Sequence, residues 1–233
     1  MKNKYTMYSV FSQSPVLLIV VALLLAPQAS YASLAVGVEM QSANWEVSPP
    51  ANQPNNDTTG IGLGFNVKIK FYKLYTGLDY LRGLYDFDSQ NVPGIATANP
   101  DTNVTRTEWN AVVGYDVFRY LSLFAKYKSL DFDNGANYRL ENPGVGVQVH
   151  YPLSSHWLIF ANTAQFTGDF SMSGGIRGDT DIAEQEMGIA YRPSLHTYIE
   201  IGMKRQEVDY DYDSNGKESH QLQGFSIGYH YVF

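Results

Sequence analysis

The chain has 233 residues, no cysteine and a formal net charge of -7, from 16 basic and 23 acidic residues. The lack of cysteine excludes a disulfide framework and a thiolate metal site. The acidic balance argues against nucleic-acid binding, which needs a basic footprint. Aromatic residues make up 14% of the chain, a share that suits a protein with rings at membrane interfaces.

The first 32 residues have the pattern of a secretory signal peptide. Two lysines give a positive start, residues 16–26 are an uninterrupted apolar run, and small residues flank Tyr31 where a signal peptidase would cleave. The apolar run is short for a helical span, which needs about 20 residues. We expect cleavage of residues 1–32 after Ala32, leaving one domain over residues 33–233; a retained anchor is the alternative.

Ten segments of alternating polarity follow, and each predicts a β-strand with one apolar and one polar face. In chain order they lie near residues 36–41, 60–70, 74–80, 108–117, 121–128, 144–151, 157–170, 184–192, 199–204 and 225–233. The seventh segment is ambiguous. Leu158, Phe160, Ala164 and Phe166 make the better outward face, although Asn162 interrupts it.

Short and long connections alternate between these segments. Short turns are expected near residues 71–73, 118–120, 152–155 and 192–195, and longer polar loops near 47–58, 86–103, 132–143, 171–180 and 211–219. This alternation is typical of membrane barrels with short periplasmic turns and longer external loops. Ten strands place both termini on the periplasmic side. Eight or twelve strands, or a soluble propeller or sandwich, are the alternatives.

The last segment carries large apolar residues at every second position and ends on a phenylalanine. These residues are Phe225, Ile227, Tyr229, Tyr231 and Phe233. In a water-soluble protein such a face would need a covering core, whereas lipid covers it in a membrane barrel. The pattern resembles the assembly signal of Gram-negative outer-membrane β-barrels. In general type the chain resembles the small porin-like barrels related to the transmembrane domain of outer-membrane protein A.

The resemblance implies an all-β fold, a transmembrane antiparallel up-and-down β-barrel in the cell outer membrane. It implies outer-membrane lipid and lipopolysaccharide as surroundings, and the barrel-assembly machinery and periplasmic chaperones as partners during biogenesis. A monomer without a cofactor is expected.

Charged residues of both signs occupy the predicted inward face. They are Glu39, Lys68, Lys70, Asp79, Arg106, Glu108, Asp116, Lys126, Lys128, Glu184, Glu186, Arg192, Glu200 and Lys204. A salt-bridged plug that fills the lumen is the favoured interpretation. The alternative is a narrow water-filled pore with a selective lining. Because about eight strands are just filled by their own side chains, ten leave at most a slim passage.

The expected function is that of a small porin-like or structural surface protein without enzymatic activity. Adhesion through the acidic external loops is the alternative. Within those loops, Asp211, Asp213 and Asn215 copy the opening of a calcium loop. Leu222 stands where the bidentate glutamate belongs, so these residues are only a weak metal candidate.

A third hypothesis is a hydrolase. Omptin proteases resemble the expected barrel in strand number and in the acidic and histidine residues at their outer rim. His220 near the external end of the last strand faces a partner strand with acids over residues 209–213, which would bring a carboxylate beside an imidazole. The omptin motifs themselves have no residue-by-residue match in this chain.

Overall fold

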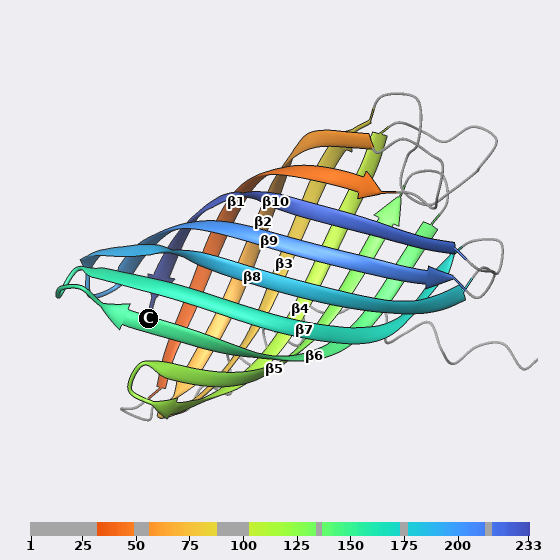
Figure 1. The fold of residues 1–233 in the computed structure, drawn as a ribbon. Coiled ribbons are helices and arrows are strands. Elements are labelled where there is room, and N and C mark those ends of the chain that lie inside the picture. Colours follow the sequence, from red (N-terminus) through yellow and green to blue (C-terminus); the bar gives the residue numbers. More distant parts are fainter. Residues whose placement is uncertain (1–31, 49–55, 88–102, 134–136, 173–176, 213–215) are drawn as a thin grey trace, which may run out of the picture. The chain divides into compact units, whose positions relative to one another are not determined.

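The computed structural model describes residues 32–48, 56–87, 103–133, 137–172, 177–212 and 216–233. These residues form ten strands, and none of them belongs to a helix long and apolar enough to cross a membrane. The strands in Figure 1 are β1 (Ala32–Ser48), β2 (Asn56–Phe71), β3 (Leu74–Asp86), β4 (Asn103–Phe118), β5 (Leu121–Asp133), β6 (Asn137–Pro152), β7 (Trp157–Met172), β8 (Arg177–Ser194), β9 (Thr197–Tyr212) and β10 (Gly216–Val232).

The sheet is closed. From β2 to β10 each strand pairs antiparallel with the next, and β1 pairs with β10, so no edge strand is left unpaired. The predicted up-and-down barrel is confirmed, with ten strands rather than eight or twelve. Four short connections, such as residues 72–73, lie at one end, which we call the turn end. The other end is the loop end.

Residues 33–233 form one compact unit. Most of the predicted signal peptide, residues 1–31, lies outside the described residues, so its cleavage remains a prediction. The inner parts of the predicted external loops also lie outside the described residues.

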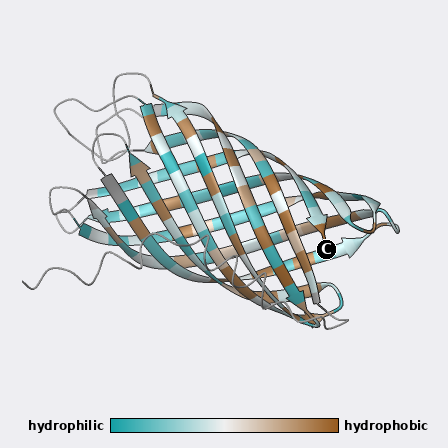
Figure 2. Ribbon diagram, turned by 180° about the vertical axis from the view of Figure 1, so that it is seen from behind, coloured by the Kyte–Doolittle hydropathy of each residue, from teal (hydrophilic) through white to brown (hydrophobic). Residues whose placement is uncertain are grey.

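In the turn-end half of the barrel, large apolar side chains point outward. On β10, Phe225 and Ile227 are 62% and 46% exposed, whereas Gly228 is buried. Figure 2 shows hydrophobic and hydrophilic residues alternating along the strands. Hydrocarbon is the medium that covers such a belt. We call it the lipid band; it includes Val36, Val38, Met40, Ile61, Leu63, Leu74, Val113, Tyr115, Leu123, Tyr127, Val145, Val149, Ile159, Met187, Ile189, Ile201, Met203, Phe225, Ile227, Tyr229 and Tyr231.

Toward the loop end, the two faces of the strands exchange polarity. On β1, outward Val38 and Met40 are followed by outward Ser42, while Ala43 and Trp45 become buried inside. Pairing of β1 with β10 continues without a break through this point, so the change lies in the sequence and not in the backbone.

We call this loop-end part of the barrel the projecting wall. Its outward residues include Ser42, Asn44, Asp57, Thr105, Asp131, Asp133, Arg139, Glu141, Thr167, Asp169, Arg177, Asp179, Asp181, Arg205, Glu207, Asp209, Asp211, Lys217, Gln221 and Gln223. A polar outside around an apolar inside is the arrangement of a water-soluble barrel. We therefore infer that the projecting wall stands in water beyond the membrane.

The assignment of β7 from sequence was wrong. Phe160, Ala164 and Phe166, expected outside, are buried in the interior, and Trp157 and Ile159 are exposed instead. Toward the loop end, Ala164, Phe166 and Phe170 join a buried apolar cluster, while Phe160 borders an interior cavity nearer the turn end. Residue size therefore no longer marks the lipid-facing side of this strand.

Candidate functional site

Two buried carboxylates organise the charges in the middle of the barrel, Glu108 on β4 and Glu184 on β8. Lys128 contacts both of them and lies 2.7 Å from Glu184. Lys204 lies 3.2 Å from Glu108 and 3.8 Å from Glu184. With two further cations these residues form what we call the central ion network: Arg106, Glu108, Lys126, Lys128, Glu184 and Lys204.

The central ion network joins walls that are distant in the strand order. Lys126 on β5 reaches Glu184 on β8 at 2.5 Å, and Arg106 on β4 donates to Gln206 on β9. Lys128 is 0% exposed. Removing charges from water is costly, and several charge-assisted contacts to each carboxylate offset that cost. The network therefore links opposite walls of the barrel across the lumen.

Between the network and the turn end lies a cavity of about 450 Å³. Its wall includes Glu39, Lys68 and Glu200. Near the turn end, Lys70 pairs with Asp116 at 2.6 Å. The cavity thus lies on the turn-end side of the central ion network and is bordered by charged side chains.

On the other side of the network, apolar side chains fill the lumen. Trp45 packs edge to face on Tyr85 and Phe87, with ring centroids 5.0 and 5.4 Å apart, and lies 5.2 Å from Phe132. The cluster, which we call the apolar core, comprises Ala43, Trp45, Val47, Tyr85, Phe87, Val104, Leu130, Phe132, Leu140, Ala164, Phe166, Phe170, Ile182, Val208, Tyr210, Tyr212 and Leu222. Its members are almost completely buried, so the core occupies the interior of the projecting wall.

The structure places the predicted lumen-lining residues in two layers. All of them except Arg106 and Lys128 border the cavity, and these two lie buried in the central ion network. Within the part of the chain that the structure describes, Glu39 and Asp79 border the cavity without an ion pair. The opposite charges are therefore only partly brought together as pairs.

Sequence reasoning missed the apolar core. Its signal is a shift in the phase of the alternation within single strands. On β1 the apolar positions change from even to odd numbers between Met40 and Ala43, and on β9 from odd to even between Met203 and Val208. The predicted segments of these two strands end at residues 41 and 204, before the phase shift, so the inward rings beyond them were not assigned.

His220 does not meet the acids that the hydrolase hypothesis required. It points into the barrel and is 5% exposed, whereas Asp209 and Asp211 lie on the outward face of β9. Its Nε2 instead contacts Glu218 on the same strand, and Tyr212 donates to the other oxygen of Glu218 at 3.2 Å. A buried Glu–His pair therefore exists, with a different carboxylate from the expected one.

The weak metal candidate is only partly described. Asp211 is exposed and lies 3.1 Å from Lys217, while Asp213 and Asn215 fall outside the described residues. Among the residues that the structure does describe, no group of three or more histidine, cysteine or acidic side chains is arranged to hold a metal ion.

Comparison with known proteins finds similar folds among solved structures only. No protein-family model matches the sequence, and the search of curated proteins finds no match. Among solved structures, the outer membrane protease OmpT of Escherichia coli matches with a TM-score of 0.57 and 11% identity, over 88% of this chain and 98% of that chain. At this identity the likeness concerns the fold alone.

Two further structures share less of the geometry. The β domain of the Bordetella autotransporter BrkA has a TM-score of 0.45 at 10% identity, over 87% of this chain and 99% of that one. Ail of Yersinia pestis has a TM-score of 0.33 at 11% identity, over 85% and 98%. With its closed antiparallel sheet and its lipid band, this chain has the fold of the Gram-negative outer-membrane β-barrels, built here from ten strands.

Proposed function

We propose that this barrel is closed to solutes and acts at the cell surface through its projecting wall and loop end. One observation carries the proposal: the lumen beyond the cavity is filled by the central ion network and then by the apolar core. Lys128, Leu130, Leu140 and Ile182 are each 0% exposed. A water-filled path needs solvent contact along its whole length, and these fully buried side chains interrupt it; the partly exposed Lys126 and Lys204 lie on the cavity side of the network.

The outward face of the projecting wall supports a role in surface recognition. Its named side chains are polar, the acidic ones outnumber the basic ones, and the strands carry the loop end beyond the lipid band. Connecting segments positioned by a rigid scaffold are where binding residues usually gather. The wall would hold such segments clear of the membrane, as an adhesion protein requires.

The proposal includes the route by which the barrel reaches its place. Residues 1–32 would direct export and be removed, and the assembly machinery would read the terminal residues Phe225 to Phe233. These residues face outward on β10, and Phe233 is 68% exposed. The barrel would act as a monomer among outer-membrane lipid and lipopolysaccharide.

Conductance in a planar bilayer tests closure. The refolded protein, shown to be folded by its heat-modifiable gel mobility, is expected to give no discrete current steps. Steps whose ion selectivity changes in Glu186→Lys would contradict closure and favour the pore. Attachment of cells that display the barrel tests the surface role. Shortening residues 88–102 should abolish attachment without changing gel mobility, and unchanged attachment would count against it.

A hydrolase is the second candidate, and the Glu218–His220 contact is the observation that favours it. A carboxylate beside an imidazole is the arrangement of a general base. Against it, the His220 ring lies under Trp45 at a centroid distance of 5.6 Å, inside the apolar core. Peptide hydrolysis lost in His220→Ala and kept in His196→Ala, an exposed histidine at the turn end, would establish it. No hydrolysis by the wild-type barrel would end it.

A further inference from the structure

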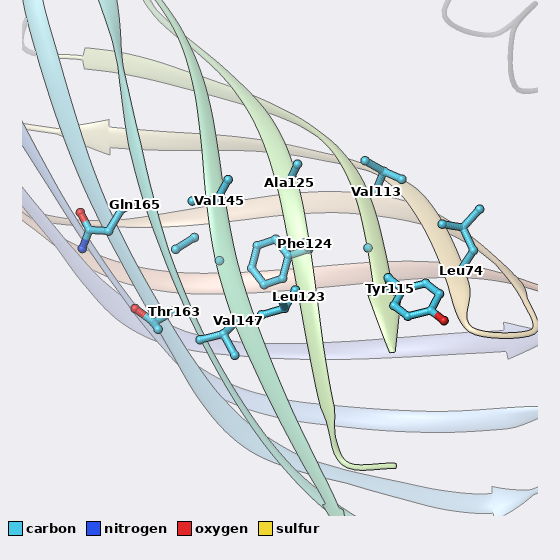
Figure 3. A pocket seen from close by; sticks show the side chains of 13 residues that line it. Leu74, Val113, Tyr115, Leu123, Phe124, Ala125, Val145, Val147, Thr163 and Gln165 are labelled. Atoms are coloured by element: carbon cyan, nitrogen blue, oxygen red, sulfur yellow. The ribbon is translucent and has the colours of Figure 1, made fainter. Parts of the chain in front are cut away.

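The outward face of the barrel carries an apolar groove across β3 to β7. Its volume is about 720 Å³. Figure 3 shows side chains around it from each of these strands, including Leu74, Val113, Ala125, Val145 and Thr163. The groove lies in the lipid band, so hydrocarbon and not water is the medium that reaches it.

Small residues create the hollow. Ala125 on β5 lies between Val113 and Val145, its direct partners on β4 and β6. Its side chain is the smallest of these three outward residues. The neighbouring Phe124 turns its ring inward against Gly146, where an added Cβ would lie 2.4 Å from the ring. The large side chain of Phe124 thus lies inside the barrel, and the outer surface beside it is hollowed.

One row of outward residues follows the groove and changes character from strand to strand. It runs Tyr115, Leu123, Val147, Thr163, Gln185 and Arg205, each the direct cross-strand partner of the next from β4 to β9. With strands about 4.8 Å apart, five steps span about 24 Å. Along this distance the row passes from apolar side chains to a hydroxyl, an amide and a guanidinium.

The row also climbs through the membrane, because strands of a barrel are tilted and a line across them is oblique. On β4, Val113 lies inside the lipid band, between Ala111 and Tyr115. On β7, the next outward residues after Gln165 toward the loop end are Thr167 and Asp169, which belong to the projecting wall. The apolar end of the row therefore lies in the lipid band near the turn end, since Tyr115 is three residues from Phe118 at the end of β4, and its polar end reaches the outer interface.

Arg205 is placed to meet an anion at that interface. Its side chain is 49% exposed; it donates to Gln221 at 3.2 Å and lies 3.5 Å from Glu207, and its other guanidinium nitrogens have no hydrogen bond to the described residues. A guanidinium presents its donors in a planar fork that suits a phosphate group. The neighbouring Gln185 adds an amide donor at the same level.

We propose that this row is a binding track for one phosphate-bearing lipid of the outer leaflet. An acyl chain occupies the groove over Ala125, and the phosphate lies at Arg205. Lipid is the occupant rather than a second barrel because the track begins in hydrocarbon and ends on a cation at the headgroup level.

Native mass spectrometry of the refolded protein in detergent tests the track, with lipid A as the probe. We expect one lipid A to stay bound, and Ala125→Leu, which fills the groove, to weaken its binding by about tenfold. Ala111→Leu is the matched control, because Ala111 is also outward in the lipid band but does not line the groove. Equal binding by the two variants would leave only unspecific lipid contact and overturn the proposal.

The phosphate end is tested separately. Arg205→Gln should weaken binding of lipid A by about tenfold and leave dephosphorylated lipid A unaffected, because only the charge-assisted contact is removed. Arg82→Gln, which removes an outward arginine of β3 outside the track, should change neither. The proposal fails if Arg205→Gln and Arg82→Gln behave alike, or if the wild type forms dimers that Ala125→Leu abolishes.

Discussion

Glu108 stabilises the barrel interior because several cations are paired with its carboxylate. Arg106, Lys128 and Lys204 all contact this carboxylate, which is 1% exposed. Removing one partner of a buried network leaves uncompensated charge behind, which costs more than the pair itself contributes. Glu108 is therefore a sensitive position of the central ion network.

We expect Glu108→Gln to lower the free energy of unfolding by about 3–5 kcal/mol, measured by urea unfolding of the barrel in lipid vesicles. Lys204→Gln should cost less, because Lys204 lies at the edge of the network and is 14% exposed. Glu207→Gln on the outward face is the control and should change little. Similar losses in Glu108→Gln and Glu207→Gln would contradict the role given to the network.

On the projecting wall, four acids stand side by side. Glu141, Asp169, Asp179 and Asp211 are consecutive cross-strand partners from β6 to β9. Like charges directly opposite each other destabilise a sheet. Cations relieve the two ends of the row, where Arg139 lies 3.0 Å from Glu141 and Lys217 lies 3.1 Å from Asp211.

Asp179→Asn should therefore stabilise the barrel by about 0.5–1 kcal/mol, since it removes two repulsive neighbours at once. The gain should shrink in high salt, which screens exposed charges. Urea unfolding at low and high ionic strength measures both effects. Asp57→Asn, an exposed acid outside the row, is the control; an equal gain there would show a general effect of net charge instead.

At the scale of the strand, one continuous β-strand serves two environments. On β9, Ile201 and Met203 face outward in the lipid band, whereas Val208, Tyr210 and Tyr212 face inward in the apolar core. The pairing of β9 with both neighbours is unbroken over this stretch. The face on which a charge is tolerated therefore changes along the strand.

Arginine substitutions along β9 test this directly. Ile201→Arg should cost about 2–4 kcal/mol, because it places a charge in hydrocarbon. Val208→Arg should cost at least as much, because it buries a charge in the apolar core. Asp209→Arg, outward on the projecting wall, should be tolerated. Folding yield and urea unfolding report all three, and a damaging Asp209→Arg would place that position in lipid.

The change of environment along each strand explains which parts of the fold could be predicted from the sequence. Alternation predicted every strand, and the lipid-facing residues of β10 and β9 were assigned correctly because lipid selects large apolar residues on one face only. The assignment failed at Phe160 and Phe166, where aromatic residues pack inside. Periodicity shows that two faces differ, but it does not show which medium each face meets.

The interior shows the same limit. The charges of the lumen were found because inward positions in the turn-end half are polar or small. Glu108 could pair with Lys128 on the next strand or with Lys204 across the lumen. The choice depends on the shear of the closed barrel, which cannot be predicted from the local sequence pattern. The contact of His220 with Glu218 was missed because both residues lie on one strand, and only a cross-strand acid was considered.

For the molecule as a whole, the layers form a sequence from the turn end to the loop end. A polar cavity is followed by the central ion network and then by the apolar core. Around the cavity the outside is apolar, and around the core it is polar. A single barrel wall thus passes from lipid into water on its outer face. Over the same length, the interior of the barrel passes from polar to apolar.

Spin labels placed one at a time at outward positions of β9, from Ile201 to Asp211, measure that passage most directly. Collisions with oxygen report hydrocarbon, and collisions with a water-soluble nickel chelate report water. The account predicts that oxygen dominates at Ile201 and Met203 and the chelate at Glu207, Asp209 and Asp211, with the change near Arg205. Labels that stay in hydrocarbon as far as Asp211, or in water from Ile201 onward, would contradict it.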